Sequence, residues 1–102
     1  MKAVLGYYEG DELRYAGKVG TGFDHVTLSE LGARLRALQR TTPPFAAADA
    51  DAIRKERDAT WAAPELVAQI GFTEWTRDGR LRHPRFQGLR DDKPARDVVR
   101  ER

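Results

Sequence analysis

Apolar positions near the amino terminus follow a strand pattern on either side of a short polar turn. Residues 3–8 and 13–19 contain aromatic and β-branched side chains, and the segment Glu9-Gly10-Asp11-Glu12 separates them. Gly10 can take the positive φ that a tight hairpin loop requires. This pattern predicts a β-hairpin, which Gly20-Thr21-Gly22 then ends.

A helical pattern follows the hairpin. Leucines recur at helical spacing while arginines occupy other positions, so one face is apolar and the remaining surface is basic. The leucines of the apolar face are Leu28, Leu31, Leu35 and Leu38. Thr27 and Glu30 have the spacing of a capping box, in which their side chains satisfy the first amides of a helix. We therefore predict a helix that begins at Thr27 and is ended by the Thr41-Thr42-Pro43-Pro44 segment.

Few large apolar side chains occur between residues 41 and 59, where alanine and charged residues predominate. We interpret this stretch as an exposed connection with one helical turn near Ile53. Thr60-Trp61-Ala62 is a candidate for a further short strand.

Strand patterns return in the last third of the chain. Residues 65–76 alternate with the period of two expected for a strand, and Arg77-Asp78-Gly79-Arg80 has the composition of a turn. Residues 81–89 predict another strand, in which Pro84 indicates an edge position or a bulge. Residues 94–101 could form a short terminal helix.

The predicted order is strand, strand, helix, strand, strand, and 102 residues are enough for one core but not for two. We therefore predict one mainly β domain over residues 1–102. Its element order is compatible with the oligonucleotide/oligosaccharide-binding fold (OB-fold), a five-stranded Greek-key barrel, here with one inserted α-helix and a short C-terminal helix. Other small β-rich folds share this order.

Composition narrows the class of protein. An apolar fraction of 40% and a charged fraction of 33% are ordinary for a water-soluble domain, and no apolar run approaches the roughly 20 residues that span a bilayer. The amino terminus lacks the apolar core of a signal peptide, so we expect a cytoplasmic location and no membrane partner.

The lack of cysteine excludes disulfides and thiolate metal sites. His25 and His83 have no companions at metal-ligand spacing, so no protein metal site is expected.

Basic residues concentrate near the carboxyl end. The formal net charge is only +2, but nine of the 18 Lys and Arg residues lie in residues 77–102. There, Arg90-Asp91-Asp92-Lys93 places a planar guanidinium, a carboxylate and an ammonium close together, which suits recognition of polyphosphate. The expected ligand is a nucleotide phosphate, a nucleic-acid backbone or both, although charge runs of this kind are usually solvated turns.

The segment from Leu81 to Lys93 resembles the carboxy-terminal signature of ATP-dependent DNA ligases, and Arg90-x-Asp92-Lys93 matches their motif VI, R-x-D-K. Further segments resemble the same domain in bacterial end-joining ligases, namely Leu5-Gly6-Tyr7-Tyr8, Tyr15 to Phe23 and Phe72 to Thr76. The resemblance covers nearly the whole chain. It implies an OB-fold domain that follows a nucleotidyltransferase domain and serves double-strand-break repair at the bacterial nucleoid.

In that family, motif VI contacts the β- and γ-phosphates of ATP. By residue match, Arg90 and Lys93 would orient and neutralise the pyrophosphate leaving group. Asp92 would help to assemble the site through metal-bound phosphates or by positioning its cationic neighbours. The resemblance implies ATP and Mg²⁺ as cofactors of the full-length ligase, with neither bound stably by this domain alone. The K-x-D-G lysine that accepts AMP in the family is absent from this sequence, so we expect no ligation by this chain by itself.

The resemblance also implies that the domain clamps nicked duplex DNA during strand sealing. Duplex binding depends chiefly on neutralising phosphates, so basic residues are the candidates for contact. These candidates are Lys18, Arg34, Arg36, Arg82 and Arg85. Gly20 and Gly22 could let the main chain approach a groove closely. The expected protein partners are the nucleotidyltransferase domain and Ku-type end-joining proteins.

Plainer interpretations accompany these hypotheses. The basic residues of the helix could form a solvated face, Trp61 and Trp75 are expected to pack rather than to stack on bases, and His83 to face solvent rather than phosphate. A function of another class is also open, that of a non-catalytic adaptor for nucleic acid or protein that keeps this fold without a nucleotidyltransferase domain. Dependence of adenylation on Arg90 and Lys93 would separate the two functions.

Overall fold

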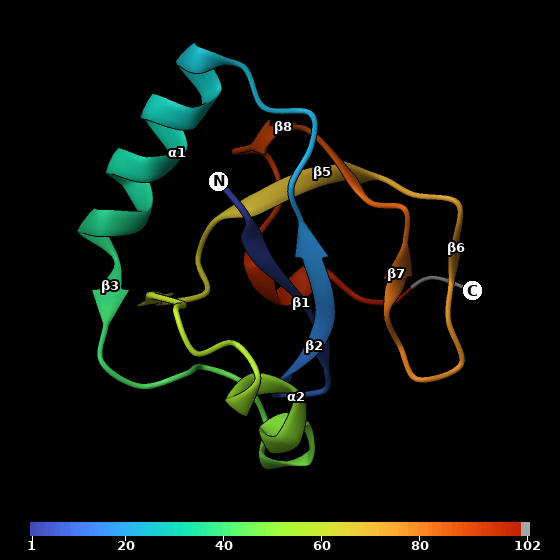
Figure 1. Ribbon diagram of the computed structural model, residues 1–102. Helices are drawn as coiled ribbons and strands as arrows, with labels where there is room; N and C mark the ends of the chain where they lie inside the picture. Colours follow the sequence, from blue (N-terminus) through green and yellow to red (C-terminus); the bar gives the residue numbers. More distant parts are fainter. Residues whose placement is uncertain (101–102) are drawn as a thin grey trace.

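Short strands and one long helix follow each other in the computed structural model, which describes residues 1–100 (Figure 1). The helical elements are α1 (His25–Ala37), α2 (Ala50–Arg54) and the 3-10 turns η1 (Ala47–Asp49) and η2 (Ala95–Asp97). The strands are β1 (Ala3–Glu9), β2 (Glu12–Val19), β3 (Gln39–Arg40), β4 (Trp61–Ala62), β5 (Val67–Gly71), β6 (Glu74–Trp75), β7 (Leu81–Arg82) and β8 (Arg85–Arg90). The predicted mainly β architecture with one inserted helix is therefore present.

The strands pair antiparallel in four ladders, β1 with β2, β3 with β4, β5 with β8 and β6 with β7. β1 and β2 form the predicted hairpin, with Gly10 at a φ of 63° in its turn. Each of the two longer predicted strands is divided, 65–76 into β5 and β6, and 81–89 into β7 and β8. The second division falls at His83, which has a φ of 53°, and at Pro84, which has no amide to donate to a ladder.

The long helix begins earlier than predicted because Asp24, rather than Thr27, is its N-cap. The carboxylate of Asp24 accepts a hydrogen bond from the amide of Thr27 (2.7 Å), and this bond lowers the pKa of Asp24. Glu30 does not close a capping box; it lies 3.7 Å from the guanidinium of Arg34, on the next turn. Helix α1 therefore starts at His25.

The predicted terminal helix over residues 94–101 is reduced to the single turn η2. The chain then extends along β1 instead of continuing to coil. The amide of Tyr8 donates to the carbonyl of Val98 (2.7 Å), and Val99 forms a parallel bridge with Tyr8. Glu101, the last residue of the predicted helix, lies outside the described residues.

The connection between residues 41 and 59 folds against the hairpin rather than being fully exposed. The predicted helical turn near Ile53 is α2, and Ile53 is buried. Asp49 is buried too, and its carboxylate accepts hydrogen bonds from Nε of Arg14 and from the amide of Tyr15, both at 2.9 Å. The sequence of this connection predicts exposure to solvent, but hydrogen bonds to Asp49 from residues 34 and 35 positions earlier hold it against the hairpin.

Phe86 of β8 packs between the hairpin and α1. The buried core cluster consists of Val19, Leu31 and Phe86. Phe23 stacks on Phe86 with 4.7 Å between ring centroids. Gly22 runs so close to β8 that a Cβ on it would lie 2.1 Å from the carbonyl oxygen of Phe86. Gly22 is therefore required for a close approach to β8 within the protein, and its approach to a nucleic-acid groove stays a prediction.

Substitution of Gly22 should reveal how strongly this approach is constrained. Gly22→Ala should destabilise the domain by roughly 3 kcal/mol or more, because the methyl meets backbone atoms and the φ of 93° disfavours an L side chain. Gly17→Ala is the matched control. Gly17 has a φ of 109° but no atom within 4 Å of an added Cβ, so its cost should stay near ~1 kcal/mol. Urea unfolding measures both, and equal losses would show that contact with β8 does not limit position 22.

Asp49 should make the stability of the domain depend on pH. Burial alone would raise the pKa of Asp49, but hydrogen bonds from Arg14 and Tyr15 and the charge of Arg14 outweigh burial, so the pKa is lowered. A carboxyl with a lowered folded pKa stabilises the fold above its unfolded pKa of about 3.9, and this contribution is lost as pH falls through the folded value. Asp49→Asn should therefore cost roughly 2 kcal/mol near neutral pH and less in acid.

Urea unfolding at several pH values between about 7 and 3 tests this expectation, since the lowered pKa places the loss below about pH 4. Asp11→Asn is the control, because Asp11 forms an exposed pair with Arg96 (3.3 Å) and should change stability little at any pH. A destabilisation by Asp49→Asn that stays constant through the acid range would argue against a charged Asp49 in the fold.

Candidate phosphate-binding site

A bulge in the β5–β8 ladder determines where the end of β8 points. The register shifts once along the ladder, so β8 carries an extra residue beside Gly88, which has a φ of 153°. Phe86 and Leu89 are three positions apart, yet both pack into the core, which strict alternation would forbid. Because Leu89 faces inward, Arg90 is directed outward at the end of the strand.

Arg90 presents its guanidinium edge to a carboxylate at the surface. Its Nε and Nη2 donate to the two carboxylate oxygens of Asp92, at 3.2 and 3.0 Å, and its Nη1 donates to Oε1 of Gln69 (3.4 Å). The bond from Arg90 lowers the pKa of Asp92, and Asp92 raises the pKa of Arg90. The side chains of Arg90 and Asp92 are 37% and 70% exposed, so a ligand can reach this bidentate pair.

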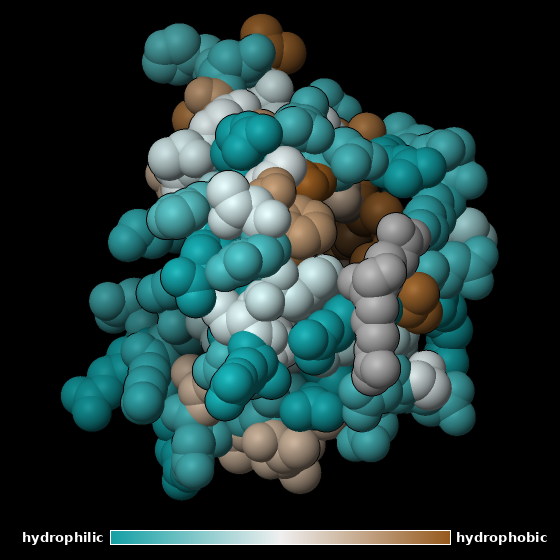
Figure 2. Space-filling view, turned by 90° about the vertical axis from the view of Figure 1, so that its right-hand side faces the viewer, coloured by the Kyte–Doolittle hydropathy of each residue, from teal (hydrophilic) through white to brown (hydrophobic). Residues whose placement is uncertain are grey.

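Two neighbours extend the site on either side of Asp92. Lys93 is partly buried, and together with Arg90 it lines a largely apolar hollow of about 910 Å³. Figure 2 shows brown hydrophobic side chains at the floor of a hollow that teal hydrophilic side chains surround. Asp91 accepts a hydrogen bond from Nη2 of Arg34 on α1 (2.9 Å). The segment Arg90–Lys93 thus groups the predicted phosphate-binding residues and connects them to one residue of the predicted DNA-binding set.

The other predicted DNA-binding residues lie apart from this group. Lys18 lies 3.1 Å from Glu56, and Arg82 lies 3.1 Å from Glu74. Within residues 1–100, Arg36 and Arg85 are exposed and form no ion pair. Arg85 begins β8, which puts it roughly 15 Å along the strand from Arg90.

The contacts of Gln69 and Asp91 at this site could not be predicted from the residues near them in the sequence. Gln69 contacts Arg90 because β5 and β8 are paired, and Asp91 contacts Arg34 because α1 packs beside β8. The alternation of residues 65–76 indicated a strand, but it did not indicate which strand would be its partner. Such contacts follow from tertiary pairing and not from a local motif.

The predicted packing of the tryptophans is confirmed. Trp75 is partly buried with its ring 5.3 Å from that of Tyr7, and Trp61 lies 5.9 Å from Phe45 by ring centroids. His83 is exposed, as expected, and its Nδ1 lies 3.4 Å from Oγ1 of Thr73.

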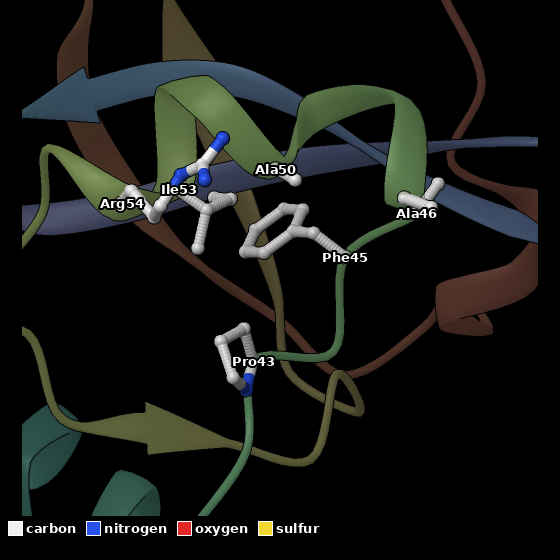
Figure 3. Close-up of a pocket in the computed structure, with 7 residues that line it drawn as sticks. Pro43, Phe45, Ala46, Ala50, Ile53 and Arg54 are labelled. Atoms are coloured by element: carbon white, nitrogen blue, oxygen red, sulfur yellow. The ribbon is translucent and has the colours of Figure 1, made fainter.

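A second cavity offers little for an anion. It has a volume of about 300 Å³ and lies beneath α2, where the ring of Phe45 sits between Pro43 and Ile53 (Figure 3). Its one charged lining residue, Arg54, is paired with Asp51. The Arg90–Lys93 segment is therefore the better candidate for binding polyphosphate.

Within the part of the chain that the structure describes, no three His, Cys, Asp or Glu side chains are grouped as ligands for a metal ion. Among the same residues, no helix has both the length and the apolar character needed to cross a membrane.

Comparison with protein families finds a match over residues 2–93 to the ATP dependent DNA ligase C terminal region. The multifunctional non-homologous end joining protein LigD of Pseudomonas aeruginosa is 39% identical over 102 residues, which is 97% of this chain and 12% of that protein. LigD of Mycolicibacterium smegmatis is 42% identical over 96% of this chain and 13% of its own length. A DNA ligase of Halorubrum lacusprofundi is 34% identical, over 93% of this chain and 15% of its own length.

Solved structures agree with these sequence matches. The ligase domain of LigD from M. tuberculosis superposes with a TM-score of 0.85 at 36% identity, over 98% of this chain and 32% of that one. A mycobacterial DNA ligase D complexed with ATP and MES gives a TM-score of 0.82 at 36% identity, over 98% of this chain and 33% of that one. The chain therefore corresponds to about one third of a ligase domain and to about one eighth of the length of the LigD proteins.

The Arg90–Asp92 pair can be tested by titration. Arg90→Ala removes the largest cause of the lowered pKa of Asp92, so that pKa should rise toward the ordinary carboxyl value. Asp78 is the internal control, because its pKa is lowered chiefly by the hydroxyl of Thr76 and should not change. Carboxyl NMR titration of the wild type and of Arg90→Ala measures the shift. An Asp92 pKa that is the same with and without Arg90 would mean that the pair is not formed in solution.

Proposed function

This chain belongs to the family of ATP-dependent DNA ligase C-terminal regions, and from this membership we propose that it supplies motif VI for enzyme adenylation and holds nicked DNA during sealing. Its fold is the OB-fold of the similar ligase domains. The observation that carries the proposal is the bidentate contact of Arg90 with Asp92, with Lys93 beside it. A guanidinium edge that donates to two carboxylate oxygens can donate to two phosphate oxygens in the same way.

In the proposed reaction a lysine of a nucleotidyltransferase domain attacks the α-phosphate of ATP. The lysine nitrogen loses a proton, a nitrogen–phosphorus bond forms, and the bond from the α-phosphate to the bridging oxygen of pyrophosphate breaks. Arg90 and Lys93 bind the β- and γ-phosphates, align the leaving group and stabilise its developing charge. Asp92 keeps the Arg90 guanidinium oriented until the phosphates arrive.

The described residues do not fit a resident metal site. Asp92, the carboxylate closest to the proposed phosphates, has both oxygens engaged by Arg90, and no group of three possible ligands surrounds it. Mg²⁺ is therefore proposed to belong to the ATP and to the rest of the ligase, and this chain alone is proposed not to hold ATP or Mg²⁺ stably.

For the DNA-binding step we propose contacts from the phosphate-neutralising residues Lys18, Arg36, Arg82 and Arg85. Arg36 and Arg85 make no ion pair within residues 1–100, and both side chains of the Arg82–Glu74 pair are more than half exposed, so duplex phosphates can compete for these three cations. Lys18 is 39% exposed, and its partner Glu56 is more buried, so Lys18 is held more tightly than the other three. The end-joining names of the relatives support a place in double-strand-break repair. We accordingly propose a nucleotidyltransferase domain and Ku-type proteins as partners in a bacterial cytoplasm, at the nucleoid.

A chimera provides the test. In this chimera the chain replaces the matching third of the M. tuberculosis LigD ligase domain. The two superpose over 98% of this chain. Arg90→Ala and Lys93→Ala should each slow transfer of labelled AMP from ATP to the enzyme by roughly 100-fold, because they remove charge that faces the leaving group. Sealing of a pre-adenylated nick should change little, since no pyrophosphate is present in that step.

Arg96→Ala is the control for loss of an exposed arginine, because Arg96 pairs with Asp11 (3.3 Å), lies over the ring of Tyr8 (5.8 Å) and is outside the proposed machinery. Equal loss in adenylation and in sealing would contradict the proposed role of Arg90 and Lys93. A folded chimera that is not adenylated, yet still binds DNA in a salt-dependent manner, would favour the adaptor function instead.

A further inference from the structure

Arg34 is the one predicted DNA-binding residue that contacts the Arg90–Lys93 segment. Its Nη2 donates to Oδ1 of Asp91 at 2.9 Å, across 57 residues of sequence, and its Nη1 lies 3.7 Å from Oε1 of Glu30 one turn earlier. Asp91 raises the pKa of Arg34 through this hydrogen bond. The guanidinium of Arg34 is therefore directed at the chain that follows β8.

Core packing of α1 fixes the position of Arg34. Leu31 lies one turn before Arg34 on α1 and is buried in the same cluster as Phe86 of β8. Residues three apart on a helix are neighbours on its surface, so the backbone of Arg34 has a defined position relative to β8. Arg34 can thus hold Asp91 against a fixed support.

The other end of the contact lies outside regular secondary structure. Residues 91–93 form a bend between the end of β8 and the turn η2, outside any strand ladder. Asp91 directly follows Arg90 and stands two positions before Lys93. A hydrogen bond to Asp91 therefore restricts the bend that carries Lys93 and that directly follows Arg90.

We propose that Arg34 is a positioning residue for motif VI in the adenylation step rather than a contact to DNA phosphate. This inference rests on the proposed function and deepens it. An exposed ion pair contributes little to the free energy of unfolding, but small displacements of groups that align a leaving group can cost large factors in rate. Loss of Arg34 should therefore affect adenylation much more than stability.

The test uses the same chimera and separates the two steps of ligation. Arg34→Ala and Asp91→Asn should each lower kcat/KM for ATP in adenylation by roughly 10-fold, and the double variant should lose no more than either single variant, because all three lack the same contact. Sealing of a pre-adenylated nick and affinity for nicked DNA should stay within about two-fold of wild type. The exchanged pair Arg34→Asp with Asp91→Arg should recover part of the loss.

Controls make each outcome decisive. Arg34→Gln keeps the length of the side chain without its charge and replaces Arg34→Ala if the latter unfolds, which thermal unfolding will show. Arg96→Ala removes a more exposed Arg–Asp pair elsewhere and should leave adenylation unchanged. Arg36→Ala, on the same helix, should weaken sealing and DNA binding but not adenylation.

Contrary outcomes are distinguishable. Slower sealing or weaker DNA binding with normal adenylation in Arg34→Ala would overturn the inference and return Arg34 to the DNA-binding set. Additive losses in the double variant would show that Arg34 does not act through Asp91. If Arg90→Ala itself leaves adenylation unchanged, the proposed function fails; if Arg90→Ala is slow and Arg34→Ala is not, only the inference fails.

Discussion

The contact of the Gly22 loop with Phe86 is the constraint on which this domain depends. The amide of Phe86 donates to the carbonyl of Thr21 (2.9 Å), and a side chain at position 22 would occupy the space of the Phe86 backbone. The ring of Phe86 is then enclosed by the core and stacked on Phe23. Burial of one such ring contributes roughly 2–3 kcal/mol. Here it joins the end of the hairpin and the long helix to β8, which is distant from both in sequence.

From this contact the charged surface acquires its geometry. Leu31 and Arg34 are one helical turn apart on α1, while Phe86 and Arg90 are the second and last residues of β8. Because Leu31 and Phe86 meet in the core, the points from which Arg34 and Arg90 extend are fixed relative to each other. The bulge beside Gly88 then turns Leu89 inward and leaves Arg90 outside. Apolar packing thus sets the placement of polar groups that it does not touch.

Local signals in the sequence predicted what depends on neighbouring residues. The hairpin around Gly10 was predicted correctly. Arg90 and Asp92 are close together in the chain and in contact, and their role in binding phosphate stays a prediction. The helix cap was wrong because Asp24 and Thr27 are both favourable N-cap residues, and only the backbone geometry decides between them. Burial of Asp49 could not be predicted, since its partners lie in another element. The Arg34–Asp91 contact required knowledge that α1 packs beside β8.

Two Arg–Asp pairs of similar chemistry show how burial separates structural from functional roles. Arg14 and Asp49 have side chains only 26% and 3% exposed, so separating them would leave the buried carboxylate of Asp49 without its cation. The Arg90–Asp92 pair is 37% and 70% exposed, and such pairs contribute only about 0–1 kcal/mol. A polyphosphate carries more charge than one carboxylate and can therefore replace Asp92 at Arg90 at little cost. Exposure, rather than the identity of the partners, makes this arginine available to a ligand.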